Sequence, residues 1–248
     1  MRPDQIALQL YTLRAASQSD FLGVLRAVAA MGYRAVEPAG LYGVPAAEVR
    51  AVLDELGLRA PSAHVPLEKL ESDLDAQIAD LKALGCSYAT VPFVTEARRR
   101  SAADVSTLAG QLNTLGRQVR DAGLQLAYHH HAFEFAPLDK GTMWEILTAE
   151  TDPALVKLQI DAFWADRGGH DPAALIRRHG DRVVMLHLKD RAADGSDVPA
   201  GTGSLDWDAI LAAGRESGVE LYICEQDNPR DAFEDARRAY EEMAKRAS

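Results

Sequence analysis

Ionisable side chains in this sequence gather at the carboxyl ends of short apolar runs. Most of these runs are apolar until their last one or two residues, where an acid, an imidazole or an amine follows. A chance distribution would place such groups at both ends of the runs, so the bias predicts one shared site. The residues are Glu37, His64, the run 129–131 of three histidines with Glu134 just beyond it, Asp161, His187, Lys189, Glu225 and Asp227.

Four of these residues make a ligand set for one divalent metal ion: Glu134, Asp161, His187 and Glu225. Three carboxylates and one imidazole suit a hard or borderline ion such as Mn²⁺, Mg²⁺, Co²⁺ or Zn²⁺. A bound cation also explains how several carboxylates share one cavity, because their mutual repulsion would otherwise raise some of their pKa values strongly. The sequence therefore predicts a metal site.

The elements that position these residues follow a recurring pattern, in which a helical stretch ends, a glycine follows and an apolar run begins. Glycine closes a helix in the left-handed conformation without a steric penalty. The glycines are Gly32, Gly57, Gly85, Gly123, Gly180 and Gly218. We expect strands over 33–37, 58–64, 87–93, 124–131, 182–189 and 219–225, and two more over 6–11 and 155–161.

Helix start signals lie between these strands. Pro45 and Pro172 stand where a first helical residue is expected, Ser101 begins a capping box, and Asp206 opens another helix. The last helix is predicted over 229–246. Eight strands alternating with eight helices predict a single (β/α)₈ TIM barrel over residues 1–248. An open doubly wound sheet is the alternative, but the first strand–helix turn lacks its glycine-rich phosphate motif.

The composition fits this fold and limits the partners. The chain has 248 residues and a formal net charge of −10, which would repel the nucleic-acid polyanion. Neither a signal peptide nor an apolar run of membrane-spanning length is visible, and only two cysteines, Cys86 and Cys224, occur. We therefore expect a cytoplasmic protein that binds neither nucleic acid nor a membrane.

Eight stretches together give a more specific indication. They resemble, in the same order, motifs of the sugar phosphate isomerase/epimerase family. These are the xylose isomerase-like barrels that include ketose 3-epimerases, hydroxypyruvate isomerase, inosose dehydratase and endonuclease IV. Each motif alone is weak, but together they span nearly the whole chain. The stretches are 10–14, 32–37, 62–64, 128–135, 159–164, 186–190, 201–207 and 224–227.

The resemblance implies a metal-dependent isomerase or epimerase. In this family a Glu, an Asp, a His and a Glu from strands five to eight hold the metal, and this pattern falls on Glu134, Asp161, His187 and Glu225. Family epimerases use the two glutamates, here Glu134 and Glu225, as opposed catalytic bases. A ketose or keto-sugar would then react by proton transfer through a metal-stabilised enediolate.

Five further residues are predicted to bind the substrate: Glu37, His64, His131, Trp164 and Lys189. In a strand, His129 and His131 share one face, and we expect His131 toward the substrate and His129 in the barrel lining. Trp164 stands where characterised ketose 3-epimerases carry a substrate-binding histidine.

Other functions remain open at this point. A lyase acting on a keto-inositol or a 3-keto-glycoside could use the same site. An abasic-site endonuclease and a barrel that binds sugar without catalysis are less favoured. Asp206 and Asp208 place negative charge beside the loop 201–203, which favours an unphosphorylated sugar or polyol as the small-molecule substrate. The charged last helix is either a solvent-exposed face or a homo-oligomer contact.

Overall fold

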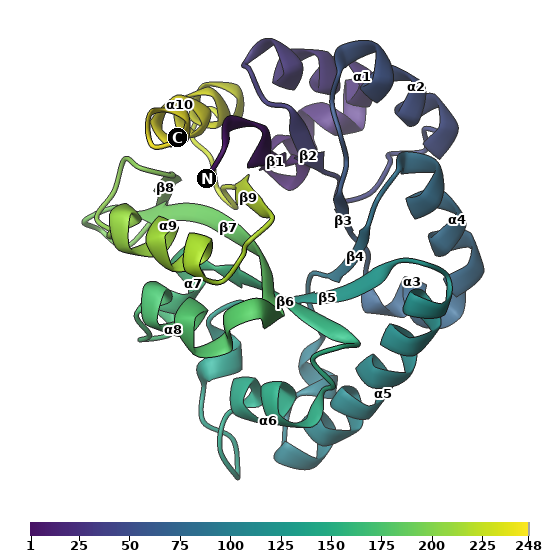
Figure 1. Ribbon diagram of the computed structural model, residues 1–248, viewed down its shortest axis with the longest axis vertical. Coiled ribbons are helices and arrows are strands. Elements are labelled where there is room, and N and C mark those ends of the chain that lie inside the picture. Colours follow the sequence, from purple (N-terminus) through teal and green to yellow (C-terminus); the bar gives the residue numbers. More distant parts are fainter. Residues whose placement is uncertain (248) are drawn as a thin grey trace.

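The computed structural model describes residues 1–247 and confirms the predicted barrel. Eight parallel strands run in the order β2-β1-β9-β7-β6-β5-β4-β3, and helices surround them (Figure 1). Most of the strands are short. Their bounds are β1 Ile6–Gln9, β2 Ala35–Glu37, β3 Ser62–His64, β4 Tyr88–Val91, β5 Gln125–His129, β6 Val156–Asp161, β7 Val183–Arg191 and β9 Leu221–Cys224.

One or two helices connect each strand to the next and cover the outside of the barrel. Two of the connections are split, with α3 preceding α4 and α7 preceding α8. The helices are α1 Arg14–Ala30, α2 Ala46–Leu56, α3 Leu67–Ser72, α4 Leu74–Leu84, α5 Ala102–Asp121, α6 Met143–Glu150, α7 Ala162–Arg167, α8 Pro172–His179, α9 Trp207–Glu216 and α10 Ala232–Lys245.

The local signals act as expected. All six junction glycines have positive φ, and two of them, Gly57 and Gly85, close α2 and α4 in the left-handed conformation. The Ser101 and Asp206 side chains accept hydrogen bonds from the first turns of α5 and α9. The main difference from the sequence prediction is β8 (Asp197–Pro199), a short strand that pairs antiparallel with the extended end of β7.

The barrel has one weak seam, between β2 and β3. No ladder joins these strands, and the backbone bonds across the gap run mainly through Arg59, which accepts from the Val36 amide and donates to the Arg34 carbonyl. The segment 58–61, predicted as strand, therefore stays largely outside the sheet. The His64 amide donates to the Pro38 carbonyl and completes the closure.

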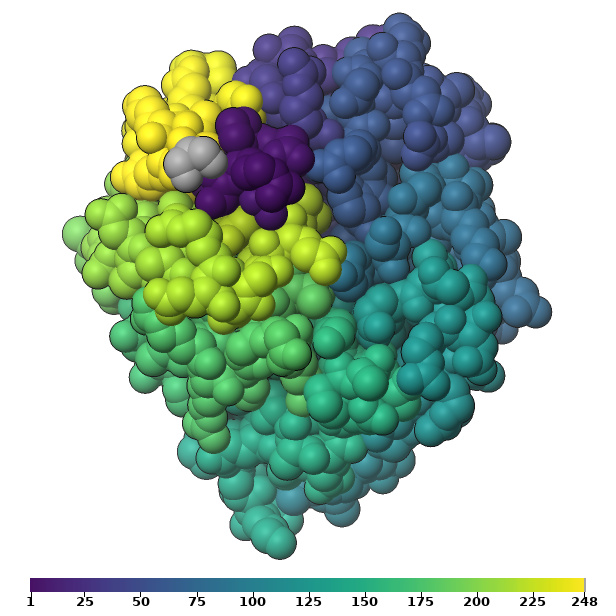
Figure 2. All heavy atoms as spheres, viewed as in Figure 1, coloured from purple at the N-terminus to yellow at the C-terminus, as the bar shows by residue number. Residues whose placement is uncertain are grey.

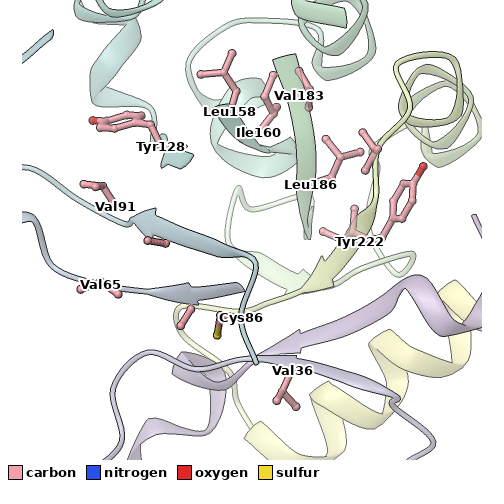
Figure 3. Close-up of a cluster of buried hydrophobic side chains, with 14 of the residues drawn as sticks. Val36, Val65, Cys86, Val91, Tyr128, Leu158, Ile160, Val183, Leu186 and Tyr222 are labelled. Carbon is pink, nitrogen blue, oxygen red and sulfur yellow. The ribbon is translucent and has the colours of Figure 1, made fainter. Parts of the chain in front are cut away.

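Apolar side chains form two separate regions because successive strand residues point to opposite faces. The large region fills the space between strands and helices, where Val36, Tyr128 and Leu186 pack (Figure 3). The small region lies inside the barrel, and few of its side chains are large. Its residues are Ala7, Ala35, Ala127, Val184, Met185, Leu221 and Ile223. The rest of the barrel interior is polar, and this part carries the site.

The first and last segments of the chain meet on one face of the molecule, where α10 packs against β1 (Figure 2). Cys86 and Cys224 are both buried free thiols. Among the described residues, every helix is too short or too polar to cross a membrane.

Candidate active site

A layer of polar side chains fills the barrel interior at the carboxyl ends of the strands. The strand register sets this layer, because it pairs Gln9 with Glu37, and Asp161 with His187, on neighbouring strands. All four side chains are fully buried. In TIM barrels the active site lies at the carboxyl ends of the strands. The ionisable groups therefore cluster at the end of the barrel where this fold places its active sites.

Glu37 is the centre of this layer. Its carboxylate accepts hydrogen bonds from Gln9, Ser62, Gln159 and His187, at 2.5 to 2.9 Å. Burial alone would raise the pKa of Glu37, but the His64 and His187 imidazoles lower it to about 2. Both carboxylate oxygens are thus occupied by the protein. Glu37 supports the site from below rather than lining a cavity.

His187 links Glu37 to the next carboxylate. Its Nε2 lies 2.7 Å from Glu37 Oε2, and its Nδ1 lies 2.9 Å from Glu225 Oε2. Burial lowers the pKa of His187, yet the two carboxylates outweigh it and raise the pKa to about 10. The position between Nδ1 and Glu225 Oε2 therefore suits a proton or another cation.

Lys189 brings a second positive charge to the same carboxylates. Its ammonium lies 2.6 Å from Asp227 Oδ2, 2.8 Å from Glu225 Oε2 and 3.2 Å from Asp161 Oδ2, and it is fully buried. Burial opposes the charge, but the three carboxylates raise the pKa of Lys189 well above its usual value. The same contacts lower the pKa of Glu225 well below its usual value despite burial.

Four buried side chains offer metal-ligand atoms within 4.8 Å of one another: His129, Asp161, His187 and Glu225. One of their atoms, His129 Nδ1, has no hydrogen-bond partner in the described part of the chain, and Asp161 Oδ2 makes only ion-pair contacts, with Lys189 and His187. A buried polar atom without a hydrogen-bond partner is costly unless a ligand satisfies it. The residues therefore fit a divalent metal ion. Binding of the ion requires the Lys189 ammonium to move away from Asp161 Oδ2 and Glu225 Oε2, which it contacts in this structure.

Glu134 is the predicted residue that the structure does not bring to this group. The Tyr128 hydroxyl donates to its Oε1 and the His131 amide to its Oε2, at 2.9 and 2.8 Å. Tyr128 faces the helices, and the chain turns outward after β5, so the carboxylate lies in the layer outside the barrel. Burial raises the pKa of Glu134 to about 8. In the structure His129, not Glu134, completes the four-residue group.

A cavity of about 400 Å³ opens above the polar layer. Its wall includes His64, His129 and His131 from β3, β5 and the turn after β5, and Glu225 and Asp227 from the end of β9. His131 Nδ1 is buried without a partner in the described residues, and burial with the Lys189 charge lowers the pKa of His131 to about 3. The cavity thus has imidazoles on one side and carboxylates on the other.

The remaining predicted residues lie around this cavity. Trp164, at the start of α7, is 5.5 Å from the His131 ring and 5.4 Å from the Lys189 ammonium. It lines an adjoining pocket and not the cavity itself. Lys189 lies below the cavity floor, among the carboxylates.

The glycine-rich loop 201–203 has its amides occupied. Asp190, fully buried, accepts from the Gly201, Gly203 and Leu205 amides and from the Trp207 indole. Amides that could hold a phosphate therefore hold an internal carboxylate instead. This supports the expectation of an unphosphorylated ligand.

Sequence reasoning placed His129 in the barrel lining without a chemical role and missed Gln159 and Gln9. His129 carries a usable signal, because it alternates in phase with His131 and ends its strand. The glutamines carry none, since an amide within an apolar run has no distinctive spacing.

Comparisons with known proteins agree with this geometry. The family model described as "Xylose isomerase-like TIM barrel" matches residues 25–246. The inosose dehydratase of Geobacillus kaustophilus is 29% identical over 197 residues, which cover 67% of this chain and 61% of that protein. The chain thus spans less than two thirds of the length of this relative.

Two solved structures share the fold. A sugar phosphate isomerase/epimerase from Parabacteroides distasonis superimposes with a TM-score of 0.84 at 23% identity, covering 95% of this chain and 96% of that one. The IOLI protein, whose crystal structure holds a zinc atom, superimposes with a TM-score of 0.73 at 17% identity, covering 98% and 95%.

Proposed function

The chain belongs to the xylose isomerase-like TIM barrel family, and we propose that it is a metal-dependent lyase acting on an unphosphorylated keto-polyol or keto-sugar. The reaction would remove a proton next to the ketone and expel an oxygen substituent from the following carbon. A dehydratase is the simplest case, with water as the leaving molecule.

One observation carries this choice. Glu225 lines the cavity, and its Oε1 has no hydrogen-bond partner among residues 1–247, whereas its Oε2 is bound by His187 and Lys189. Glu134, the second base that a two-glutamate epimerase needs, lies outside the barrel. An elimination needs only one such carboxylate, because the same group can take up a proton and return it on the same face.

The site supports a metal ion held by His129, Asp161, His187 and Glu225. When bound, the ion would polarise the ketone of the substrate and stabilise negative charge on its oxygen. Two imidazoles with two carboxylates favour Zn²⁺, Co²⁺ or Mn²⁺ over Mg²⁺, which prefers oxygen ligands.

The protein residues account for the remaining steps. The substrate C–H bond next to the ketone breaks and its proton passes to Glu225 Oε1. The electron pair forms a carbon–carbon double bond as the C–O bond of the next carbon breaks. The leaving oxygen accepts this proton from Glu225 and departs as water. His64 and His131 donate hydrogen bonds to substrate hydroxyls from the other side of the cavity.

The relatives support two versions of this chemistry. The name of the Geobacillus relative favours dehydration of a keto-inositol. The name of the Parabacteroides structure favours the second candidate, an isomerase or epimerase. His131, an imidazole with a free nitrogen across the cavity from Glu225, is the observation that favours this second candidate.

Incubation with keto-sugars in D₂O separates these candidates. Protein loaded with Zn²⁺, Co²⁺ or Mn²⁺ is mixed with a keto-inositol or with free ketoses, and proton exchange is followed by NMR and products by mass spectrometry. We expect exchange next to the ketone together with loss of one water from the keto-inositol.

Exchange without loss of water, on any of these compounds, would support the isomerase or epimerase instead. Absence of both exchange and water loss on every compound would contradict both candidates. Metal-free protein prepared with a chelator is the control, and it should show neither reaction.

A further inference from the structure

A second pocket adjoins the cavity. This side pocket lies between α7, the β7–β8 hairpin and the start of α10, which occupy one side of the barrel in Figure 1. Its volume of about 660 Å³ exceeds the 400 Å³ of the cavity. The proposed reaction on a single ring uses only the cavity, so the side pocket has no role in it.

The two spaces share one wall. Asp227 lines both, with its Oδ2 held 2.6 Å from the Lys189 ammonium. The Asp197 carboxylate, on β8, accepts from the backbone amides of Asp227 and Asn228. The hairpin therefore fixes the segment after β9 and keeps this shared wall in place.

The side pocket offers ring-binding surfaces. Phe163 and Trp164 line it with ring centroids 4.9 Å apart, and Val198 adds an apolar surface. The Trp164 indole N–H is buried without a hydrogen-bond partner in the described residues. Aromatic rings pack against the apolar faces of sugar or aryl rings, and the indole keeps a donor for an oxygen.

The charged side chains of the side pocket nearly balance, with three arginines against four aspartates, so a neutral ligand fits it. Four aspartates line it, and each accepts a hydrogen bond from the protein itself: Asp194, Asp197, Asp227 and Asp235. The guanidinium groups of Arg230 and Arg238 have no ion-pair partner among residues 1–247, so they can donate to neutral oxygens.

We propose that the side pocket binds a second ring, joined through an oxygen atom to the keto ring in the cavity. The substrate class is then a keto-sugar glycoside rather than a free ketose or cyclitol. This inference rests on the proposed elimination and names its leaving group.

The reaction balances without a further reactant. The C–H bond next to the ketone and the C–O bond to the second ring break, and a carbon–carbon double bond forms. The proton taken from carbon goes to the leaving oxygen. The second ring therefore leaves as an alcohol, in place of water, with no change in redox state.

Binding and turnover are compared for one-ring and two-ring compounds. The binding probes are a disaccharide, an aryl glucoside and glucose, titrated by calorimetry or ligand-observed NMR. The turnover probes are a 3-keto-disaccharide, an aryl 3-keto-glucoside and a keto-inositol. The disaccharide and aryl arms show whether the second ring is a sugar or an aromatic group.

Two variants and a control test the pocket. Ser196→Trp places a bulky side chain at the hairpin that lines the side pocket, and Trp164→Phe removes the indole N–H together with the pyrrole ring that carries it. Ser19→Trp, on the exposed face of α1 and outside both linings, is the matched control. We expect Ser196→Trp to raise the ratio of two-ring to one-ring Kd at least about tenfold, and Trp164→Phe about fivefold, the worth of one hydrogen bond.

An unchanged Kd ratio in Ser196→Trp, or equal binding of one-ring and two-ring compounds to the natural protein, overturns the proposal. The binding arm does not need turnover, so it tests the side pocket even if the elimination fails. Loss of water from the keto-inositol together with no preference for two rings would support the proposed function and reject the side pocket.

Discussion

Two carboxylates of this protein are equally buried and behave in opposite ways. Glu37, inside the barrel, and Glu134, in the layer between β5 and the helices, are both fully inaccessible to solvent. Burial raises the pKa of both carboxyl groups. Glu134 nevertheless has a pKa of about 8, and Glu37 one of about 2.

The neighbours explain the difference. Glu37 contacts the imidazoles of His64 and His187, whereas Glu134 accepts only from a hydroxyl and a backbone amide. The His187 imidazole, whose pKa is raised to about 10, favours the ionised carboxylate as a cation, and neutral donors do not repay the cost of burying its charge. The barrel interior thus stabilises the ionised form of Glu37, whereas the surroundings of Glu134 favour its neutral form.

The largest expected effect is on turnover, which should depend on a carboxylate inside the barrel and not on Glu134 outside it. Glu225→Gln removes the proposed base inside the barrel and should lower kcat about a thousandfold, in the range of general base catalysis, with the fold intact. Glu134→Gln should change kcat little. Both variants are assayed beside their circular dichroism spectra. Loss of turnover in Glu134→Gln would instead favour the two-glutamate prediction from the sequence.

The second effect concerns stability. Glu37→Gln leaves His64 and His187 without their carboxylate partner, and removing one partner of a buried ion pair costs about 3 kcal/mol. Urea unfolding at neutral pH measures this cost. The matched variant Glu134→Gln should lose far less, since the Glu134 carboxyl group has no ion-pair partner among residues 1–247. Equal losses would mean that the charges inside the barrel contribute nothing.

The third effect concerns the metal. The Lys189 ammonium lies within 3.2 Å of two oxygens of the metal-ligand group, so it repels a divalent ion that binds there. Lys189→Met should raise the affinity for Zn²⁺ or Mn²⁺ at least about tenfold, a free-energy change of roughly 1.4 kcal/mol.

Competition with a metal-binding dye measures this affinity, and Lys189→Arg, which keeps the charge, is the control. His187→Ala should lose the metal, as elemental analysis would detect. Metal content unaffected by His187→Ala would exclude His187 as a ligand.

The last effect is the pH dependence of stability. The pKa of Glu134 is about 8 in the folded protein and near 4.5 in the unfolded chain. Between these values the unfolded chain releases a proton that the folded protein keeps, so stability falls as pH rises toward 8. Glu134→Gln should flatten this fall by up to about 1.4 kcal/mol per pH unit, measured by urea unfolding from pH 5 to 8.5. Identical slopes in both proteins would show that Glu134 is ionised in the fold.

The residues that sequence reasoning located best lie within a regular strand or at its end. Asp161 ends β6 and His187 lies inside β7, and strand alternation fixes which way both side chains point. Glu134 lies five residues beyond the last residue of β5, where the chain has turned away, and alternation no longer determines its direction.

The sequence does not show which carboxylates inside the barrel line the cavity and which are occupied by protein side chains. Glu37 was predicted to bind substrate, yet four side chains from other strands converge on it and occupy its oxygens. Such convergence depends on closure of the barrel, which links residues up to 150 positions apart. The fold, in contrast, depends on local signals that recur in most units, and these suffice to predict it.

The weak seam between β2 and β3 connects the site to the dynamics of the barrel. Few backbone bonds cross it, but the Ser62 hydroxyl and the His64 ring, both from β3, reach Glu37 at the end of β2. Side-chain contacts of the polar layer therefore join β2 and β3, where backbone hydrogen bonds between the two strands are few. Amide hydrogen exchange should be fastest along this seam, and filling the site with a ligand should slow it most there, before any other strand pair responds.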